Sequence, residues 1–481
     1  MRNGRQRVSI IAAAVITGLV GCGCKKADQA DRDTASSRRP NIVLITIESL
    51  RHDHVGCYGY DRTTTPTLDA LAGEGIAFDN VYSVTSWTLA AHASLFTGLY
   101  PTAANIIYPK DRLHEAYTTL AELLADGGYD TAAVVSGTYL LSKFKLDQGF
   151  AAYDDSIAQP PGGKRVSIGD VTNPQMEEAL LDYFDKRGQT DRPFFLFAYF
   201  WDPHYDYIPP EPYDKMFVPS DAKPISLAHY DGQKNPVKKG ISPQELAYVI
   251  SQYDGEIRCT DDVLGRVFQK MKDRGLWDNT VVIVTADHGE EFFEHDNKGH
   301  KNNVFAESVR IPLIIKPAQA TAARRDDRLA SLVDLFPTIL DFADVEGDLH
   351  LLQGYSLLDE PVGQPVYCEL TTSWYFRNKK TGEKWKESDL WLSIRQGQHR
   401  VVGMKNDKKN KKRWQLFDVI ADPGEQSPLG ADQTDLQLEM KSRVRKWYEY
   451  MKQLAATIGE RGEADLSPAE LERLRGLGYI E

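Results

Sequence analysis

The segment from residue 41 to residue 48 has the sequence Asn-Ile-Val-Leu-Ile-Thr-Ile-Glu. It is almost entirely apolar or β-branched before its terminal carboxylate, which is typical of a strand covered on both faces. Comparable short runs lie at 131–135, 194–200, 280–285 and 311–315, and helical patterns lie between them at 118–126, 176–187 and 243–275. This alternation predicts a doubly wound α/β domain built on a mainly parallel sheet.

The sequence pattern changes after about residue 345. Strand-like runs separated by turns follow at 365–369, 390–396, 399–405 and 414–419, and they predict a small antiparallel sheet. A helix at 434–456 and a charged stretch at 466–480 close the chain. We therefore expect a catalytic α/β domain at 40–345, a C-terminal α+β subdomain at 346–430, and a C-terminal helix and tail at 431–481.

The N-terminus has the features of an export signal. Three arginines precede an apolar run at 8–20 that is too short to cross a membrane as a mature helix. The run ends in Leu19-Val20-Gly21-Cys22, which resembles the lipobox of bacterial lipoproteins, where the cysteine becomes the acylated first residue. We expect a signal peptide at 1–21, a tether at 22–39, and an exported lipoprotein of the cell envelope held to a membrane through Cys22. An ordinary signal peptide with an incidental cysteine is the alternative.

Composition narrows the possible partners. The net charge is −12 and the basic residues are scattered, apart from a cluster at 405–413, so the chain presents no broad basic face for nucleic acid. Within that cluster, the run from Lys408 to Arg413 is interpreted as a solvated hairpin tip, with an anion-binding patch as the alternative. Cys57, Cys259 and Cys368 lack metal-like spacing, and we expect them to be buried.

Polar residues follow two of the predicted strands at the point where each ends. Glu48 comes directly after the first strand, and Asp287 and His288 come after the strand at 280–285. The carboxyl ends of parallel strands meet at one edge of a sheet, so these side chains can converge on a divalent cation. Helix capping is the alternative for each of them. It explains Glu48 as well as metal binding does, but it explains the Asp-His pair less well, because a histidine adds nothing as a cap.

A third element is the segment from residue 86 to residue 98, Ser-Trp-Thr-Leu-Ala-Ala-His-Ala-Ser-Leu-Phe-Thr-Gly. It predicts a turn leading into a short helix that ends at Gly98. The hydroxyl of Thr88, at the start of this helix, can be an N-cap or a nucleophile whose transferred anion rests on free backbone N–H groups. An unactivated threonine is hardly ionised at neutral pH, so the second role needs a metal.

These motifs resemble the sulfatase branch of the alkaline phosphatase superfamily. The resemblance begins with Pro40 to Pro101 and covers nearly the whole mature chain. Further similar segments are 193–197 with 202–204, 253–256 with 287–291, 299–300 with 310–314, and 416–418 with 422–423. The resemblance implies an alkaline-phosphatase-like α/β fold and hydrolysis of an anionic ester.

The resemblance also implies roles for individual residues. Thr88 stands where sulfatases carry the Cys or Ser that becomes formylglycine, while Ala90 replaces the Pro of that motif and His92 its Arg. Formylglycine is therefore not expected. Glu48 stands at the first metal-binding Asp and Ser49 where a second Asp often lies. Both departures resemble the lipoteichoic-acid synthases and phosphoethanolamine transferases, which use Glu, Thr, Asp and His around one divalent ion. The implied metal ligands are Glu48, Thr88, Asp287 and His288, holding Ca²⁺, Mg²⁺, Mn²⁺ or Zn²⁺.

Three further histidines complete the set. His204 matches a family residue that contacts the substrate anion or leaving group, with a buried structural histidine as the alternative. His300 lies near the second anion-binding basic residue, with Lys301 as the alternative, and His295 could simply face solvent. The catalytic set is then Thr88, His92, His204 and His300.

The sequence predicts metal-dependent hydrolysis of sulfate or phosphate esters of a glycan, lipid or small molecule, with Thr88 as the nucleophile. Two alternatives remain. One is a phosphoglycerol- or phosphoethanolamine-type phosphotransferase or a phosphodiesterase. The other is a lipid-anchored binding protein without activity.

Overall fold

The computed structural model describes residues 39–158, 171–187, 192–230, 235–319, 321–347, 350–360, 363–377, 384–405, 414–430, 434–459 and 461–476. The predicted signal peptide, Cys22, the tether and the basic run at 408–413 lie outside these ranges. Within them, no helix is both long enough and apolar enough to cross a membrane.

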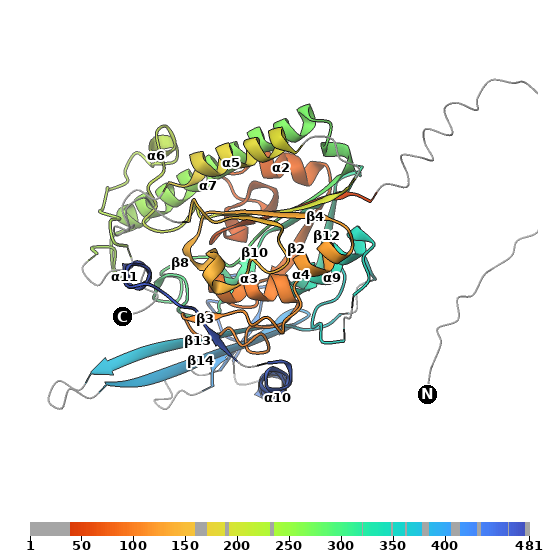
Figure 1. Ribbon diagram of the computed structural model, residues 1–481. Helices are drawn as coiled ribbons and strands as arrows, with labels where there is room; N and C mark the ends of the chain where they lie inside the picture. Colours follow the sequence, from red (N-terminus) through yellow and green to blue (C-terminus); the bar gives the residue numbers. More distant parts are fainter. Residues whose placement is uncertain are drawn as a thin grey trace, which may run out of the picture. The chain divides into compact units, whose positions relative to one another are not determined.

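A mixed, mostly parallel sheet forms the centre of the molecule (Figure 1). Its strand order in the described residues is β10 (Arg310–Ile311), β2 (Ile76–Tyr82), β11 (Leu313–Lys316), β7 (Thr280–Ala286), β1 (Asn41–Ile47), β6 (Phe194–Phe200), β4 (Asp130–Val135) and β5 (Ala152–Asp154), with β12 (Arg324–Ser331) paired to β2. β1 pairs in parallel with both β6 and β7. The predicted doubly wound α/β fold is confirmed.

Helices cover both faces of this sheet (Figure 1). One layer contains α2 (Pro66–Gly73), α5 (Asn173–Lys186) and α7 (Pro243–Asp273), and the other contains α3 (Thr88–Thr97), α4 (Leu120–Asp126) and α9 (Leu335–Ala343). Every residue of β1, β6 and β7 is buried as a result. The long helix α7 begins where the sequence favours it, because Ser242 and Glu245 form a capping box around Pro243.

One predicted strand differs from the expectation. The run at 311–315 is not a single parallel strand, because Pro312 lacks an N–H and separates β10 from β11. β11 then runs antiparallel to β7 and β2. A buried antiparallel strand is as apolar as a parallel one, so composition does not reveal its direction. β2 was not predicted, and its middle contains the polar residues Asp79 and Asn80.

The C-terminal region contains the predicted antiparallel sheet, in the order β13 (Val366–Arg377), β14 (Lys384–Gln396), β15 (His399–Met404) and β16 (Gln415–Asp418). Helix α10 (Thr434–Ile458) packs on it through a separate apolar cluster that includes Leu392, Val401 and Val444. Cys259 and Cys368 are buried as expected, whereas Cys57 is only partly buried.

The remaining elements are short. They are α6 (Tyr213–Met216), α8 (Ala306–Val309), α11 (Pro468–Gly476), β3 (Asp111–Arg112), β8 (Glu291–Phe292), β9 (Lys298–Gly299) and β17 (Gly462–Glu463), together with 3₁₀ helices at His52–His54, Gly56–Tyr58, Thr138–Leu140, Ser142–Phe144, Trp277–Asn279 and Leu332–Asp334. Among them, β8, β9 and α8 follow β7 along the chain.

Candidate active site

The chain turns sharply where β1 ends. Ser49 has a φ of 53°, in the left-handed region that is uncommon for a residue with a side chain. This turn directs the fully buried Glu48 inward, where its carboxylate accepts hydrogen bonds from Ser49 Oγ at 2.8 Å and from the hydroxyl of Tyr199 on β6. The Ser49 backbone N–H donates to Asp287 Oδ1 at 3.1 Å, and this bond ties the ends of β1 and β7 together.

The end of β7 places Asp287 and His288 against Glu48. His288 Nδ1 donates to the carbonyl oxygen of Gly289 at 2.9 Å, which leaves Nε2 facing Glu48 Oε1 at 3.2 Å and Asp287 Oδ2 at 3.5 Å. Asp287 Oδ2 is buried and has no hydrogen-bond partner. A buried carboxylate oxygen without a hydrogen bond is costly, and Oδ2 has the His288 and His92 rings at 3.5 and 3.9 Å, so this atom is able to bind a cation.

Thr88 is the first residue of α3, and it joins the same group. Trp87 occupies the N-cap position without a side-chain cap, so the Thr88 hydroxyl does not cap the helix. Its Oγ1 lies 3.2 Å from Glu48 Oε2 and 3.4 Å from His288 Nε2, and the residue is fully buried. The structure therefore brings Glu48, Thr88, Asp287 and His288 together.

His92 lies one helical turn beyond Thr88 and is also fully buried. Its Nδ1 donates to the Thr88 carbonyl oxygen at 2.8 Å, and its Nε2 accepts from Thr46 Oγ1 at 2.9 Å. Burial lowers the pKa of His92 to about 4, so the ring is neutral at pH 7. With both nitrogens bonded to the protein, His92 supports Thr88 and does not supply the charge that an arginine would bring to this position.

His204 and His300 lie next to one another, and His300 lies next to His288. His300 follows β9, and its Nδ1 lies 3.4 Å from Ser49 Oγ and from the carboxylate of Glu290. Its ring centre is 4.5 Å from that of His288 and 5.3 Å from that of His204. His204 stacks on Trp201, and its Nδ1 donates to the Tyr205 carbonyl oxygen at 2.5 Å.

Lys301, the alternative anion-binding residue, packs against Trp87. Its Nζ is 4.8 Å from the ring centre of Trp87, the residue that precedes Thr88. Of these two residues, His300 lies beside the candidate metal group, with its ring centre 4.5 Å from that of His288.

The pKa shifts of these residues indicate that the group can bind a cation. Burial alone would raise the pKa of Glu48, but His288, His204 and His300 hold it well below its usual value. Burial and the nearby Glu48 charge raise the pKa of Asp287. Burial lowers the pKa of His288, yet the two carboxylates raise it to about 10, so they already draw a positive charge into the site. A divalent cation supplies that charge with the preferred oxygen and nitrogen ligands.

The geometry also adds a residue to the predicted metal group. Glu48, His288 and His300 each offer a ligand atom, and these atoms lie within 4.8 Å of one another. The sequence predicted that His300 contacts the substrate anion, and it did not indicate that His300 lies beside the candidate metal ligands. It likewise gave no role to Tyr199, although an inward-facing polar residue near the end of β6 could have suggested one.

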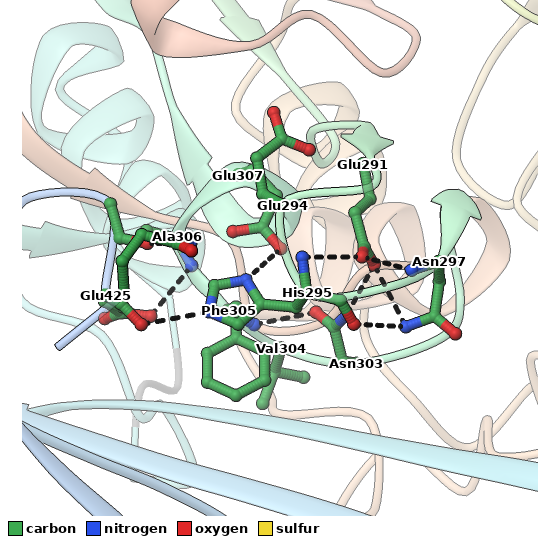
Figure 2. Close-up of polar contacts among 12 residues, drawn as sticks. Glu291, Glu294, His295, Asn297, Asn303, Val304, Phe305, Ala306, Glu307 and Glu425 are labelled. Atoms are coloured by element: carbon green, nitrogen blue, oxygen red, sulfur yellow. Dashed lines mark hydrogen bonds and ion pairs between the residues drawn. The ribbon is translucent and has the colours of Figure 1, made fainter. Parts of the chain in front are cut away.

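His295 lies away from this group and belongs to a second network (Figure 2). Its Nδ1 lies 2.9 Å from Glu307 Oε1, its Nε2 donates to the Glu425 carbonyl oxygen at 3.0 Å, and its ring stacks on Phe305. The expectation that His295 simply faces solvent is therefore wrong. The residue connects the β8–β9 hairpin to the C-terminal subdomain.

Comparisons with known proteins identify the family of the chain. The sulfatase family model matches residues 40–345, and a model described as N-sulphoglucosamine sulphohydrolase, C-terminal, matches residues 294–450. A multifunctional alkaline phosphatase superfamily protein, PehA of Trinickia caryophylli, is 26% identical over 63% of this chain and 74% of its own length. The ulvan-active sulfatase of Formosa agariphila is 28% identical over 64% of this chain, and the match spans 61% of that enzyme.

A solved structure shares the fold. The phosphonate monoester hydrolase of Agrobacterium radiobacter superposes with a TM-score of 0.66 at 22% identity, covering 86% of this chain and 96% of the other. The family model covers most of the described α/β domain and includes the Glu48, Thr88, Asp287 and His288 group. The chain therefore belongs to the sulfatase family of the alkaline phosphatase superfamily and is a sulfuric-ester-hydrolase-like enzyme.

Proposed function

We propose that this protein is a metal-dependent hydrolase of sulfate or phosphate esters that uses unmodified Thr88 as its nucleophile. The observation that carries the proposal is the position of Thr88 Oγ1, within 3.5 Å of both Glu48 and His288 at the end of the sheet. The unpartnered Asp287 Oδ2 supports a cation at the same place. Glu48, Asp287, His288 and Thr88 would hold it, with His300 beside them.

Bound metal would lower the pKa of the Thr88 hydroxyl and neutralise charge on the ester. The Thr88 hydroxyl passes its proton to Glu48 Oε2, to which it donates at 3.2 Å, and Oγ1 attacks the sulfur or phosphorus. The S–O or P–O bond to the leaving oxygen breaks, and a covalent ester forms on Thr88. The start of α3 stabilises the added charge through its free N–H groups and dipole. His92, neutral and hydrogen-bonded to the Thr88 carbonyl, fixes the first turn during this step.

We assign His204 the proton transfers. Burial lowers its pKa to about 3 in the free protein, and an anionic substrate would raise that pKa. Protonated His204 then donates to the departing alkoxide. In the second half, neutral His204 accepts a proton from the water that attacks the Thr88 ester, and the bond between Thr88 Oγ1 and the sulfur or phosphorus breaks. Thr88 Oγ1 takes its proton back from Glu48, which regenerates the threonine hydroxyl and releases sulfate or phosphate. His300 is less suited to this role because it lies within the candidate ligand group.

Phosphoryl transfer is the second candidate. Thr88 and Glu48 replace the residues expected in ordinary sulfatases, and a Glu, Thr, Asp and His set resembles that of phosphotransferases in the same superfamily. Two relatives carry names that refer to activity on ulvan and to multifunctional activity, so we propose only an anionic ester as the substrate class.

A panel of esters tests the proposed function. The anchor-free chain is assayed against a matched aryl sulfate, phosphate monoester and phosphodiester, each with Ca²⁺, Mg²⁺, Mn²⁺ or Zn²⁺. We expect metal-dependent turnover of at least one ester, abolished by a chelator. A preference for the phosphodiester would establish the second candidate. A protein that binds metal but turns over none of the esters would support the non-catalytic alternative.

We also propose that the enzyme is an exported lipoprotein, because Leu19 to Cys22 resembles a lipobox. Cys22→Ser should abolish lipid labelling and shift the protein from the membrane fraction to the soluble fraction. Cys57→Ser is a suitable control and should keep the label. Absence of lipid on wild-type Cys22 would contradict this proposal without affecting the chemistry.

A further inference from the structure

Two loops of the candidate active site rest on the C-terminal subdomain. The first, residues 83–87, leads into Thr88. Strand β13 holds it, because the Glu369 N–H donates to the Val84 carbonyl oxygen at 2.8 Å. The second, residues 300–305, contains His300 and Lys301. Ser86 Oγ donates to the Asn303 carbonyl oxygen at 2.7 Å, which joins the two loops.

An ion pair of the C-terminal subdomain contacts the second loop. Arg400 on β15 and Glu425 after β16 are both fully buried, and Arg400 Nη1 bonds both Glu425 oxygens at 2.6 and 2.7 Å. Arg400 Nη2 donates to the Val304 carbonyl oxygen. Glu425 Oε2 accepts from the Ala306 N–H at 3.0 Å (Figure 2). Both charges are therefore used to bind the backbone of the loop and the start of α8.

Helix α8 links this ion pair to the segment that contains His288. The carbonyl oxygens of Glu307 and Ser308 accept from the N–H groups of Glu290 and Gly289 at 3.0 and 2.9 Å. Gly289 packs so closely that a Cβ would lie 2.0 Å from the Glu307 carbonyl oxygen. Its own carbonyl orients the His288 ring. Hydrogen bonds, together with the backbone of α8 between Ala306 and Ser308, thus join Arg400 to His288.

We infer that the Arg400–Glu425 ion pair is a positioning element of the active site. It fixes α8 and the loop at 300–305, so that His288 and Thr88 face one another. Neither residue touches the reacting atoms. The inference rests on the proposed function for its catalytic meaning, and its structural part is independent of it. Removing one partner of a buried ion pair leaves the charge of the other uncompensated. The loop should therefore rearrange when Glu425 is neutralised, because Arg400 keeps its charge.

The test compares Glu425→Gln with Val401→Ala in the full chain. Val401 is next to Arg400 but belongs to the cluster that packs on α10, so its truncation weakens the subdomain without touching the loops. For each variant, hydrogen exchange of the peptide 286–309, binding of Mn²⁺ alone, and kcat and KM on the best ester are measured. Glu425→Gln should accelerate exchange in that peptide. It should also weaken Mn²⁺ binding and lower kcat by about 10- to 100-fold each, with a smaller change in KM.

Val401→Ala should lower the melting temperature and leave the other measurements at wild-type values. Glu425→Gln should also lower the melting temperature, because it leaves Arg400 unpaired. The double variant Arg400→Met with Glu425→Gln removes that charge, so it should regain melting temperature without regaining exchange protection or kcat. Wild-type exchange and Mn²⁺ affinity in folded Glu425→Gln would overturn the inference, as would equal losses in Val401→Ala. A wild-type protein without esterase activity would count against the proposed function alone, because the exchange measurement does not depend on it.

Discussion

Thr88→Ala is expected to abolish ester turnover, with a fall in kcat of roughly 10³-fold or more, because the attacking oxygen is lost. The fold should survive. The hydroxyl is not a helix cap, and its described hydrogen bonds run to Glu48 and His288, both of which belong to the candidate metal group. Thr88→Ser should retain part of the activity, because the nucleophilic oxygen remains. Steady-state kinetics on the best ester measures all three proteins.

Thr97→Ala provides the matched control for this prediction. Thr97 lies in the same helix and is also buried, and its hydroxyl donates to the Ala93 carbonyl oxygen and accepts from the Leu99 N–H, both of which are backbone groups. Its loss should lower stability slightly and leave kcat unchanged. Near-wild-type turnover by Thr88→Ala would mean that water attacks the ester directly, and the covalent route would have to be abandoned.

Asp287→Ala and Glu48→Ala should each remove most of the bound metal. Each deletes one of the two anionic ligands and leaves one carboxylate with a hydroxyl and histidines, so we expect metal affinity to fall by more than about 100-fold, beyond the loss typical of outer partners. Metal content is measured after dialysis, together with the circular dichroism of the folded protein. Activity should fall in parallel.

Asp261→Asn is the control for removal of a buried carboxylate. Asp261 accepts hydrogen bonds from the backbone N–H groups of Thr67 and Leu68 at the start of α2, so its role is structural. This variant should lose stability but keep its metal. Unchanged metal content in both Asp287→Ala and Glu48→Ala would exclude the proposed site.

Much of the fold follows from the sequence for simple physical reasons. β1, β6 and β7 are covered on both faces, so they appear as uninterrupted apolar runs. β2 was not predicted because Asp79 and Asn80 interrupt its apolar pattern. The division between β10 and β11 at Pro312 was not predicted either, because the residues on both sides of the proline are apolar. Strand direction depends on the connections in space, which periodicity does not encode.

The sequence was informative about the site where chain topology constrains it. Adjacent parallel strands end at one edge, so Glu48 and Asp287 were expected to meet, and β1 does pair with β7. By contrast, nothing local connects His295 with Glu425 or Arg400 with Val304, since these contacts join segments about a hundred residues apart. The burial of His92, which makes it neutral, likewise depends on Phe197 and Tyr199 from another strand.

The most direct test of the central claim is mass spectrometry of the peptide that contains Thr88. Wild-type enzyme is mixed with its best ester, quenched in acid during turnover and digested. The account predicts the encoded mass for the resting peptide, with Thr88 as unmodified threonine, and that mass plus one sulfate or phosphate during turnover. A resting peptide with an oxidised residue 88, or an ester that accumulates on another residue while Thr88 stays free, would contradict it.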